Sequence, residues 1–137
     1  MQAQLAWLLV AILFSTGTSL FAQKISAQKE AEVRALLDSA DVYKLTDPAR
    51  MLEYAQSILM EVPVQGNESL IVPTLVMSAN SEKIRGNFDK ALEYASRAVE
   101  VSMPTQNPEL IVRACFMKAT VFDLRDNQLH FLKIIYC

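Results

Sequence analysis

The residues best suited to chemistry in this sequence of 137 residues are one histidine, His130, and two cysteines, Cys115 and Cys137. Neither cysteine has a neighbouring ligand at metal-binding spacing, and no motif pairs the two as a disulfide. The sequence also lacks a Ser-His-Asp set, an HExxH motif and a paired CxxC motif. A lone histidine is far more often structural or exposed than a ligand. We therefore expect no catalytic residue, no cofactor-binding residue and no metal site.

Composition and charge exclude several further classes of function. The 13 basic and 15 acidic residues give a net charge of −2, which provides no electrostatic basis for binding nucleic acid. Only three glycines are present, too few to build a phosphate-binding loop in the usual way. A hydrophobic content of 52% excludes a disordered chain. These features predict a folded protein that is not an enzyme, has no cofactor and does not bind nucleic acid through this segment.

Residues 1–22 have the pattern of a secretory signal peptide. No charged residue precedes Lys24, and residues 5–14 form an unbroken apolar run of ten. Small and polar residues follow, up to a predicted cleavage point after Ala22. The segment before the run carries no Lys or Arg, so an uncleaved N-terminal membrane anchor is the alternative. Either case predicts export to a periplasmic or other extracytoplasmic location, with membrane contact only through residues 1–22 if they stay uncleaved.

The rest of the chain is organised by an internal repeat of forty residues. When residues 47–87 are aligned with residues 87–127 without a gap, twelve of 41 positions are identical. The matches fall in clusters: residues 52–55 match 92–95, and residues 70–72 match 110–112. A fixed period of this length is the signature of stacked structural repeats. We place the repeats at about 28–66, 67–106 and 107–137, with the last one incomplete.

Each repeat is predicted to contain two helices. Residues 88–102 place apolar side chains at the i, i+3, i+4 and i+7 positions of an amphipathic helix. The turn before it is expected at Gly86 or Asn87, and the helix before that turn begins either after Asn67 or at Pro73. Further helices are expected at 29–45, at 49–62 and from residue 107.

The third repeat is predicted to differ from the second. Its first helix is apolar on more than one side, so we expect it to pack between two neighbours, with Cys115 as a small buried hydrophobe. Residues 129–137 occupy the place of a second helix but include seven apolar residues in nine and no acidic residue. A repeat array normally ends in a polar capping helix. The end of the chain therefore looks like an interruption, which suggests a fragment of a longer protein.

Residues of the second repeat resemble the tetratricopeptide repeat family. They place small residues where two helices cross, glycine at the turn and an aromatic residue beside it; the matching positions are Ala79, Gly86, Phe88, Ala91, Ala98 and Pro104, with Ala119 and Phe122 in the third repeat. The resemblance covers about residues 28–137, although the period of 40 exceeds the usual 34 and is near that of HEAT and armadillo repeats. It implies an all-α fold, an α-solenoid of antiparallel helix hairpins with about two and a half to three repeats after an N-terminal signal helix.

The resemblance implies an exported scaffold that binds a protein or peptide without catalysis. Tyr54 and Tyr94, at equivalent repeat positions, are candidates to face a peptide, although packing between repeats would also explain them. An exported array of this kind is also similar to the extracytoplasmic sensor portion of a bacterial two-component histidine kinase or of a helix-turn-helix transcriptional regulator. That alternative requires truncation before the transmembrane and output modules. Separately, residues 67–69 fit the N-glycosylation sequon.

Overall fold

The computed structural model describes residues 24–136, and the side chains of this chain up to residue 129. The described part contains five α-helices, a short 3-10 helix and no strand, which confirms the all-helical prediction. The elements, in chain order, are α2 (Ala27–Val42), α3 (Pro48–Glu61), α4 (Glu68–Ile84), α5 (Phe88–Ser102), η1 (Met103–Thr105) and α6 (Pro108–Tyr136). The predicted signal peptide at 1–22 lies outside the described residues.

Local sequence signals set where the helices begin. α3 starts with Pro48, whose fixed backbone suits a first helical position, and the Asp47 carboxylate accepts a hydrogen bond from the Arg50 backbone N–H at 3.0 Å. α6 also starts with a proline, after Asn107, whose side-chain oxygen accepts from the Glu109 backbone N–H at 3.0 Å. Each cap supplies a partner to a backbone N–H group that the helix itself leaves unpaired.

The connection between α4 and α5 depends on one glycine. Of the two residues that the sequence allows at this turn, Gly86 takes the left-handed conformation, with φ of 79°, while Asn87 has φ of −88°. The turn also uses a buried carboxylate, because the Asn87 side-chain amide donates to the Glu82 carboxylate at 2.6 Å. The polar contact holds the start of α5 against the end of α4.

α4 begins before Pro73, at Glu68, with Asn67 as the preceding residue. The structure thus decides between the two starts that the sequence allows. Pro73 lies inside the helix and has no N–H to donate to the carbonyl one turn earlier. The following turns place two hydroxyl groups on the buried side, Thr74 donating to the Leu70 carbonyl at 2.7 Å and Ser78 to the Thr74 carbonyl at 3.0 Å.

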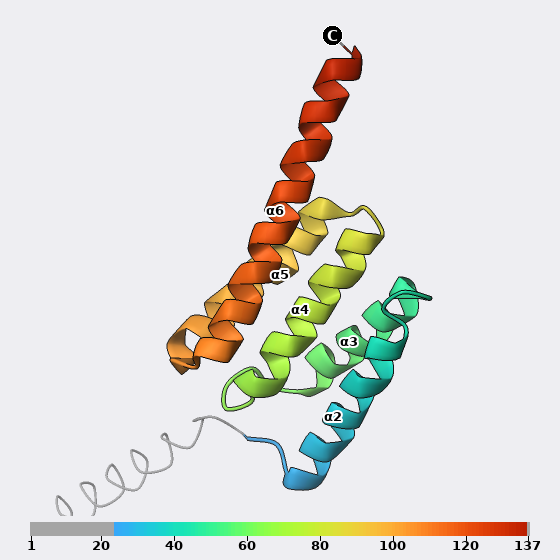
Figure 1. Cartoon of the computed structure of the whole chain (residues 1–137). Coiled ribbons are helices and arrows are strands. Elements are labelled where there is room, and N and C mark those ends of the chain that lie inside the picture. Colours follow the sequence, from blue (N-terminus) through green and yellow to red (C-terminus); the bar gives the residue numbers. More distant parts are fainter. Residues whose placement is uncertain (1–23, 137) are drawn as a thin grey trace, which may run out of the picture.

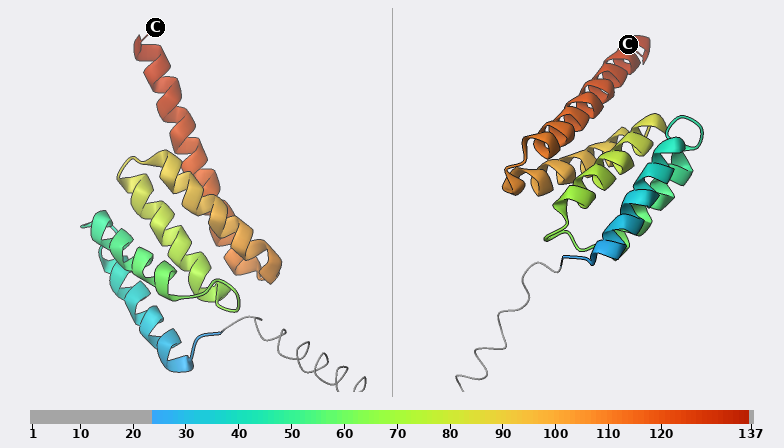
Figure 2. Two further views of the ribbon diagram at one scale, coloured as in Figure 1. Left: turned by 180° about the vertical axis from the view of Figure 1, so that it is seen from behind. Right: turned by 60° about the horizontal axis from the view of Figure 1, so that its bottom comes forward.

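α4 occupies the centre of the described structure and contacts α2, α3, α5 and α6 (Figure 1). In that view α2, α4 and α6 face the reader, whereas α3 and α5 lie behind them, as the reverse view in Figure 2 shows. The core between these two layers is formed mainly by fully buried aliphatic residues of α3 and α4, among them Ile58, Leu70, Ile71, Val72 and Leu75. Burial of these side chains is the main stabilising contribution to the fold.

α6 continues without a break through the segment where the repeat would place a second helix, and it ends at Tyr136. Asp126 occupies the position equivalent to Gly86, and it is helical. From the sequence, this helix is expected to pack between two neighbours. α6 does contact two helices, α4 and α5, but with one side only, so its other side is uncovered in the described structure. Its last turns project beyond the other helices (Figure 1).

Candidate functional site

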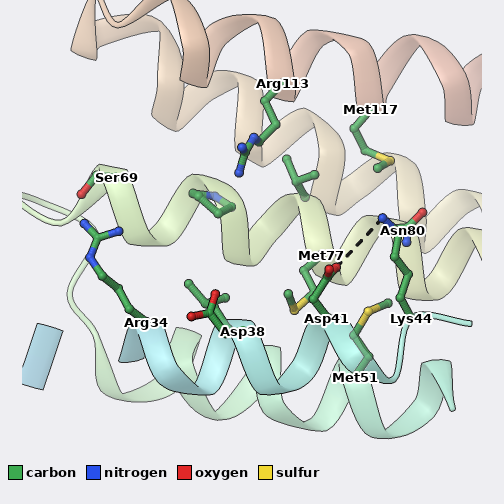
Figure 3. A pocket seen from close by; sticks show the side chains of 13 residues that line it. Arg34, Asp38, Asp41, Lys44, Met51, Ser69, Met77, Asn80, Arg113 and Met117 are labelled. Carbon is green, nitrogen blue, oxygen red and sulfur yellow. Dashed lines mark ion pairs between the residues drawn. The ribbon is translucent and has the colours of Figure 1, made fainter. Parts of the chain in front are cut away.

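A groove of about 650 Å³ crosses α2, α4 and α6. α4 forms its floor, and α2 and α6 form its two walls (Figure 3). The residues that line it are Arg34, Leu37, Asp38, Asp41, Lys44, Met51, Ser69, Pro73, Val76, Met77, Asn80, Arg113 and Met117. All but Met51 come from α2, α4, α6 or the loop after α2, so the groove is a product of the layer that these three helices share.

The forty-residue repeat determines the middle of this groove. Leu37, Met77 and Met117 are spaced at intervals of forty residues, and all three line the groove, from α2, α4 and α6 respectively. Pro73 and Val76 of α4 also line the groove, so the floor that α4 provides includes three apolar residues, Pro73, Val76 and Met77. Methionine side chains are flexible and polarisable, which lets such a surface adjust to different apolar ligand groups. Repetition of one helix position therefore produces an apolar strip across three helices.

Charged residues of both signs border the strip. Asp38 and Asp41 lie on the α2 wall, and Arg113 reaches into the groove from the α6 wall (Figure 3). The Asp41 carboxylate lies 4.0 Å from the ammonium group of Lys44, and all four of these charged residues are exposed. Asp38 makes no ion pair within the described part of the chain. Its carboxylate is therefore available to a ligand.

Each wall of the groove also carries an ion pair within its own helix. Arg34 of α2 pairs with Glu30 at 2.8 Å, and this hydrogen bond lowers the pKa of the Glu30 carboxyl group. Arg113 of α6 pairs with Glu109 at 3.5 Å. Below the groove, desolvation and the nearby charge of Lys44 lower the pKa of Lys83. The described residues contain no group of three His, Cys, Asp or Glu side chains that could hold a metal ion.

The two candidate peptide-facing tyrosines do not line the groove. Tyr54 belongs to α3 and stacks on Tyr43 with the ring centroids 6.0 Å apart, and Arg50 lies over the Tyr43 ring at 4.6 Å. Tyr94 belongs to α5, is half-buried against the core, and its hydroxyl group lies 3.5 Å from the Gln56 side-chain nitrogen. The structure does not bring the two tyrosines together with the groove residues, and a peptide contact there stays a prediction.

The predicted repeat positions fall into two groups. Ala79, Ala91 and Ala98 are fully buried at helix crossings, and Phe88 is half-buried at the start of α5. Gly86 forms the turn described above, and Pro104 lies exposed in η1. In contrast, Ala119 and Phe122 of α6 are exposed. The small-residue pattern thus accompanies close packing in the second repeat, whereas the matching side of α6 is uncovered.

The residues suited to chemistry are not gathered in a site. Cys115 is exposed, not buried as expected, because the side of α6 that carries it has no covering helix in the described structure. His130 lies in α6 beyond the described side chains, and Cys137 lies outside the described residues. A search of the described helices finds none that combines the length and the apolar character needed to cross a membrane.

Asn67, the first residue of the sequon, is only 3% exposed. Its side-chain oxygen accepts from the Ile25 backbone N–H at 3.2 Å, and its side-chain nitrogen donates to the carbonyls of Pro63 at 3.0 Å and Gln65 at 3.4 Å. That nitrogen is the atom that a glycan would modify. In the folded chain it is buried and engaged, so the sequon does not mark a surface acceptor.

The forty-residue alignment given above also pairs Met77 with Met117, but the repeat alone does not place these residues in a groove. The signal was present, because residues repeated on the first helix of each unit lie side by side when the units stack. The charged residues of the groove could not be found from the repeat, since Asp38 and Arg34 have no equivalent residue of the same charge in the other repeats. The chain matches no protein-family model, no curated protein and no solved structure.

Proposed function

We propose that this chain is an exported, tetratricopeptide-like helical scaffold that binds a peptide or protein segment in the groove between α2, α4 and α6, without catalysis. The observation that supports it best is the convergence of Leu37, Met77 and Met117 on one apolar strip. Stacked helix hairpins commonly present such a continuous surface to extended ligands. Export is supported by the sequence of residues 1–22 alone.

The chemistry of the groove favours a segment with apolar side chains at its centre and charges of both signs beside them. The apolar side chains would rest on Pro73, Val76 and Met77 of α4. A basic group on the ligand would meet Asp38, and an acidic group would meet Arg113. Because these two residues lie on opposite walls, a ligand with both charges would bind in one preferred orientation.

Selection from a random peptide library displayed on phage tests this function, with the full chain as the target. We expect enriched peptides to contain an apolar centre and to bind the Met117→Glu variant at least about tenfold more weakly, because a carboxylate would enter the apolar strip. Met60→Glu is the matched control, since Met60 lies on α3 outside the groove and is 87% exposed. Circular dichroism verifies that both variants keep their helix content.

The outcomes separate the alternatives clearly. A selection that enriches no peptide, or peptides that lose the same affinity with Met117→Glu and with Met60→Glu, would contradict binding in the groove. Peptides that depend instead on Tyr54 or Tyr94 would place the binding surface on α3 and α5.

A further inference from the structure

One buried polar side chain of the groove has no hydrogen-bond partner within the described part of the chain. The described residues include seven that are polar or charged and buried: Asn67, Thr74, Ser78, Asn80, Ser81, Glu82 and Ser102. The side chains of six of them bond to other groups of the chain. Asn80 is the exception, because its side-chain amide makes no hydrogen bond or ion pair there. Buried polar groups are almost always hydrogen-bonded, so this exception needs a physical reason.

Asn80 lies at the C-terminal end of the floor that α4 gives to the groove (Figure 3). It follows Met77 by three residues and Pro73 by seven, which places all three on one face of the helix. Only 8% of the residue is exposed, yet its amide atoms are not sealed off, since among the described residues Arg125 Nε is the fully buried side-chain atom that lacks a partner. The Asn80 amide is therefore shielded from most solvent and open to a ligand in the groove.

The equivalent positions of the other two repeats do not share this property. Ala40 of α2 is fully buried and has no polar side-chain group. The Thr120 hydroxyl of α6 donates to the Phe116 carbonyl of its own helix at 2.8 Å. Packing between repeats thus does not require an amide at this position. Among the three equivalent residues, only Asn80 presents an unbonded donor and an unbonded acceptor to the groove.

We propose that the Asn80 amide binds the main chain of an extended peptide segment, donating to the C=O and accepting from the N–H of one ligand residue; this rests on the proposed function. An asparagine side chain carries a donor and an acceptor side by side, whereas a carboxylate only accepts and an ammonium group only donates. The N–H and C=O of one residue in an extended chain point to the same side, as in paired strands. Main-chain groups that enter an apolar strip also need partners, which Asn80 supplies beside Met77.

The charged wall of α2 brings a ligand main chain to this point. Asp38 corresponds to position 78 of α4 in the forty-residue repeat, which is two residues, or about 3 Å along the helix axis, from Asn80. α2 and α4 contact each other and run in the same direction in Figures 1 and 2. A segment whose basic group meets Asp38 and which continues over α4 therefore passes close to the Asn80 amide.

Fluorescence anisotropy of a fluorescein-labelled peptide from the phage selection, titrated with the full chain, tests this contact. We expect Asn80→Leu to weaken the affinity at least about tenfold, because two hydrogen bonds are lost. The melting temperature should stay the same or rise, because no bond of the folded chain is broken and leucine favours helix more than asparagine does. Asn127→Leu is the matched control and should leave the affinity unchanged, since Asn127 is exposed on α6 and does not line the groove.

Methylation of single backbone nitrogens of the peptide distinguishes a main-chain contact from a contact with a ligand Asn or Gln side chain. At one position, methylation should weaken binding to the wild type at least about fivefold and add little loss in Asn80→Leu, because both changes remove the same bond. If no position behaves in this way, and the loss follows replacement of the peptide's Asn and Gln residues by methionine, the contact is with a side-chain amide and the main-chain assignment is wrong.

The outcomes also separate this proposal from the proposed function. An affinity that Asn80→Leu leaves unchanged or raises would overturn the contact, and a peptide that still loses affinity with Met117→Glu would keep the proposed function intact. Peptides that lose no affinity with either variant, or a selection that enriches none, contradict binding in the groove, and the Asn80 contact fails with it.

Discussion

Asn67 and Asn107 occupy identical positions in two repeats, yet the structure predicts opposite responses to the same substitution. Asn67 is buried, and its side-chain nitrogen donates to the carbonyls of Pro63 and Gln65. Asn107 is exposed, and its side-chain oxygen only accepts, from the Glu109 backbone N–H. Replacing each asparagine by aspartate keeps the acceptor and removes the donor. We therefore expect Asn67→Asp to destabilise the fold and Asn107→Asp to be tolerated.

The expected change in the free energy of unfolding follows from the hydrogen bonds that each substitution changes. Asn67→Asp loses two donor bonds, at 3.0 Å and 3.4 Å, and places a carboxylate oxygen against two carbonyl oxygens. At about 1 kcal/mol for each bond, and more for groups left unpaired, the cost is about 3 kcal/mol. Asn107→Asp keeps its bond at the N-terminus of α6 and adds a favourable interaction with the helix dipole of about 0.3–1 kcal/mol.

Urea unfolding followed by circular dichroism measures both effects. A loss of about 3 kcal/mol in the free energy of unfolding corresponds to a urea midpoint lower by about 1.5 M, while the dependence of that free energy on urea concentration stays unchanged. The carbonyl oxygens around position 67 disfavour the charged carboxylate, so they raise its pKa in the folded state. The deficit of Asn67→Asp relative to the wild type is then complete above that pKa and shrinks as the pH falls through it. Equal effects of the two substitutions at neutral pH would refute the assignment of these hydrogen bonds.

Three other predictions concern stability. Gly86→Ala should cost about 1–2 kcal/mol in urea unfolding and no more, because φ is 79° but an added Cβ meets nothing within 4 Å; a larger loss would reveal a steric clash. Ala95→Leu should cost about 1–3 kcal/mol, because Ala95 is 0% exposed, and the exposed Ala35→Leu serves as its control in thermal unfolding. Glu30→Gln should lower the melting temperature slightly at pH 7 and not at pH 2. The hydrogen bond from Arg34 lowers the pKa of Glu30 in the folded state. The stabilisation that the Glu30 carboxylate gives is therefore complete above the ordinary pKa of glutamate and is lost as the pH falls through the lowered pKa.

The helices were predictable because their signals are local. The apolar spacing over 88–102 and the caps at Asp47 and Asn107 depend on residues within a few positions of each other, and α5 has the predicted bounds. α4 could not be assigned a start, since Asn67 and Pro73 are both suitable initiators and only the packing decides between them. The course of α6 beyond Asp126 was not fixed by the sequence, because residues 129–137 occupy the place of a second helix in the repeat but depart from its composition.

The site was predictable only in part, because neighbours decide what a repeated residue does. The repeat identified Met77 and Met117 as equivalent, and they share the groove with Leu37. It also made Tyr54 and Tyr94 equivalent, but they belong to the other layer of helices. Cys115 was expected to be buried by analogy with its apolar surroundings, yet burial requires a helix on the outer side of α6.

α6 separates the proposed groove from the uncovered side of the same helix. Its backbone turns by about 100° for each residue, so Met117 of the groove lies about 160° around the helix from the exposed Ala119. The buried side chains of Ala114 and Val121 attach the helix to the core at a third angle. Substitutions at Met117 and at Ala119 therefore test different sides of one helix, and only the first should weaken peptide binding.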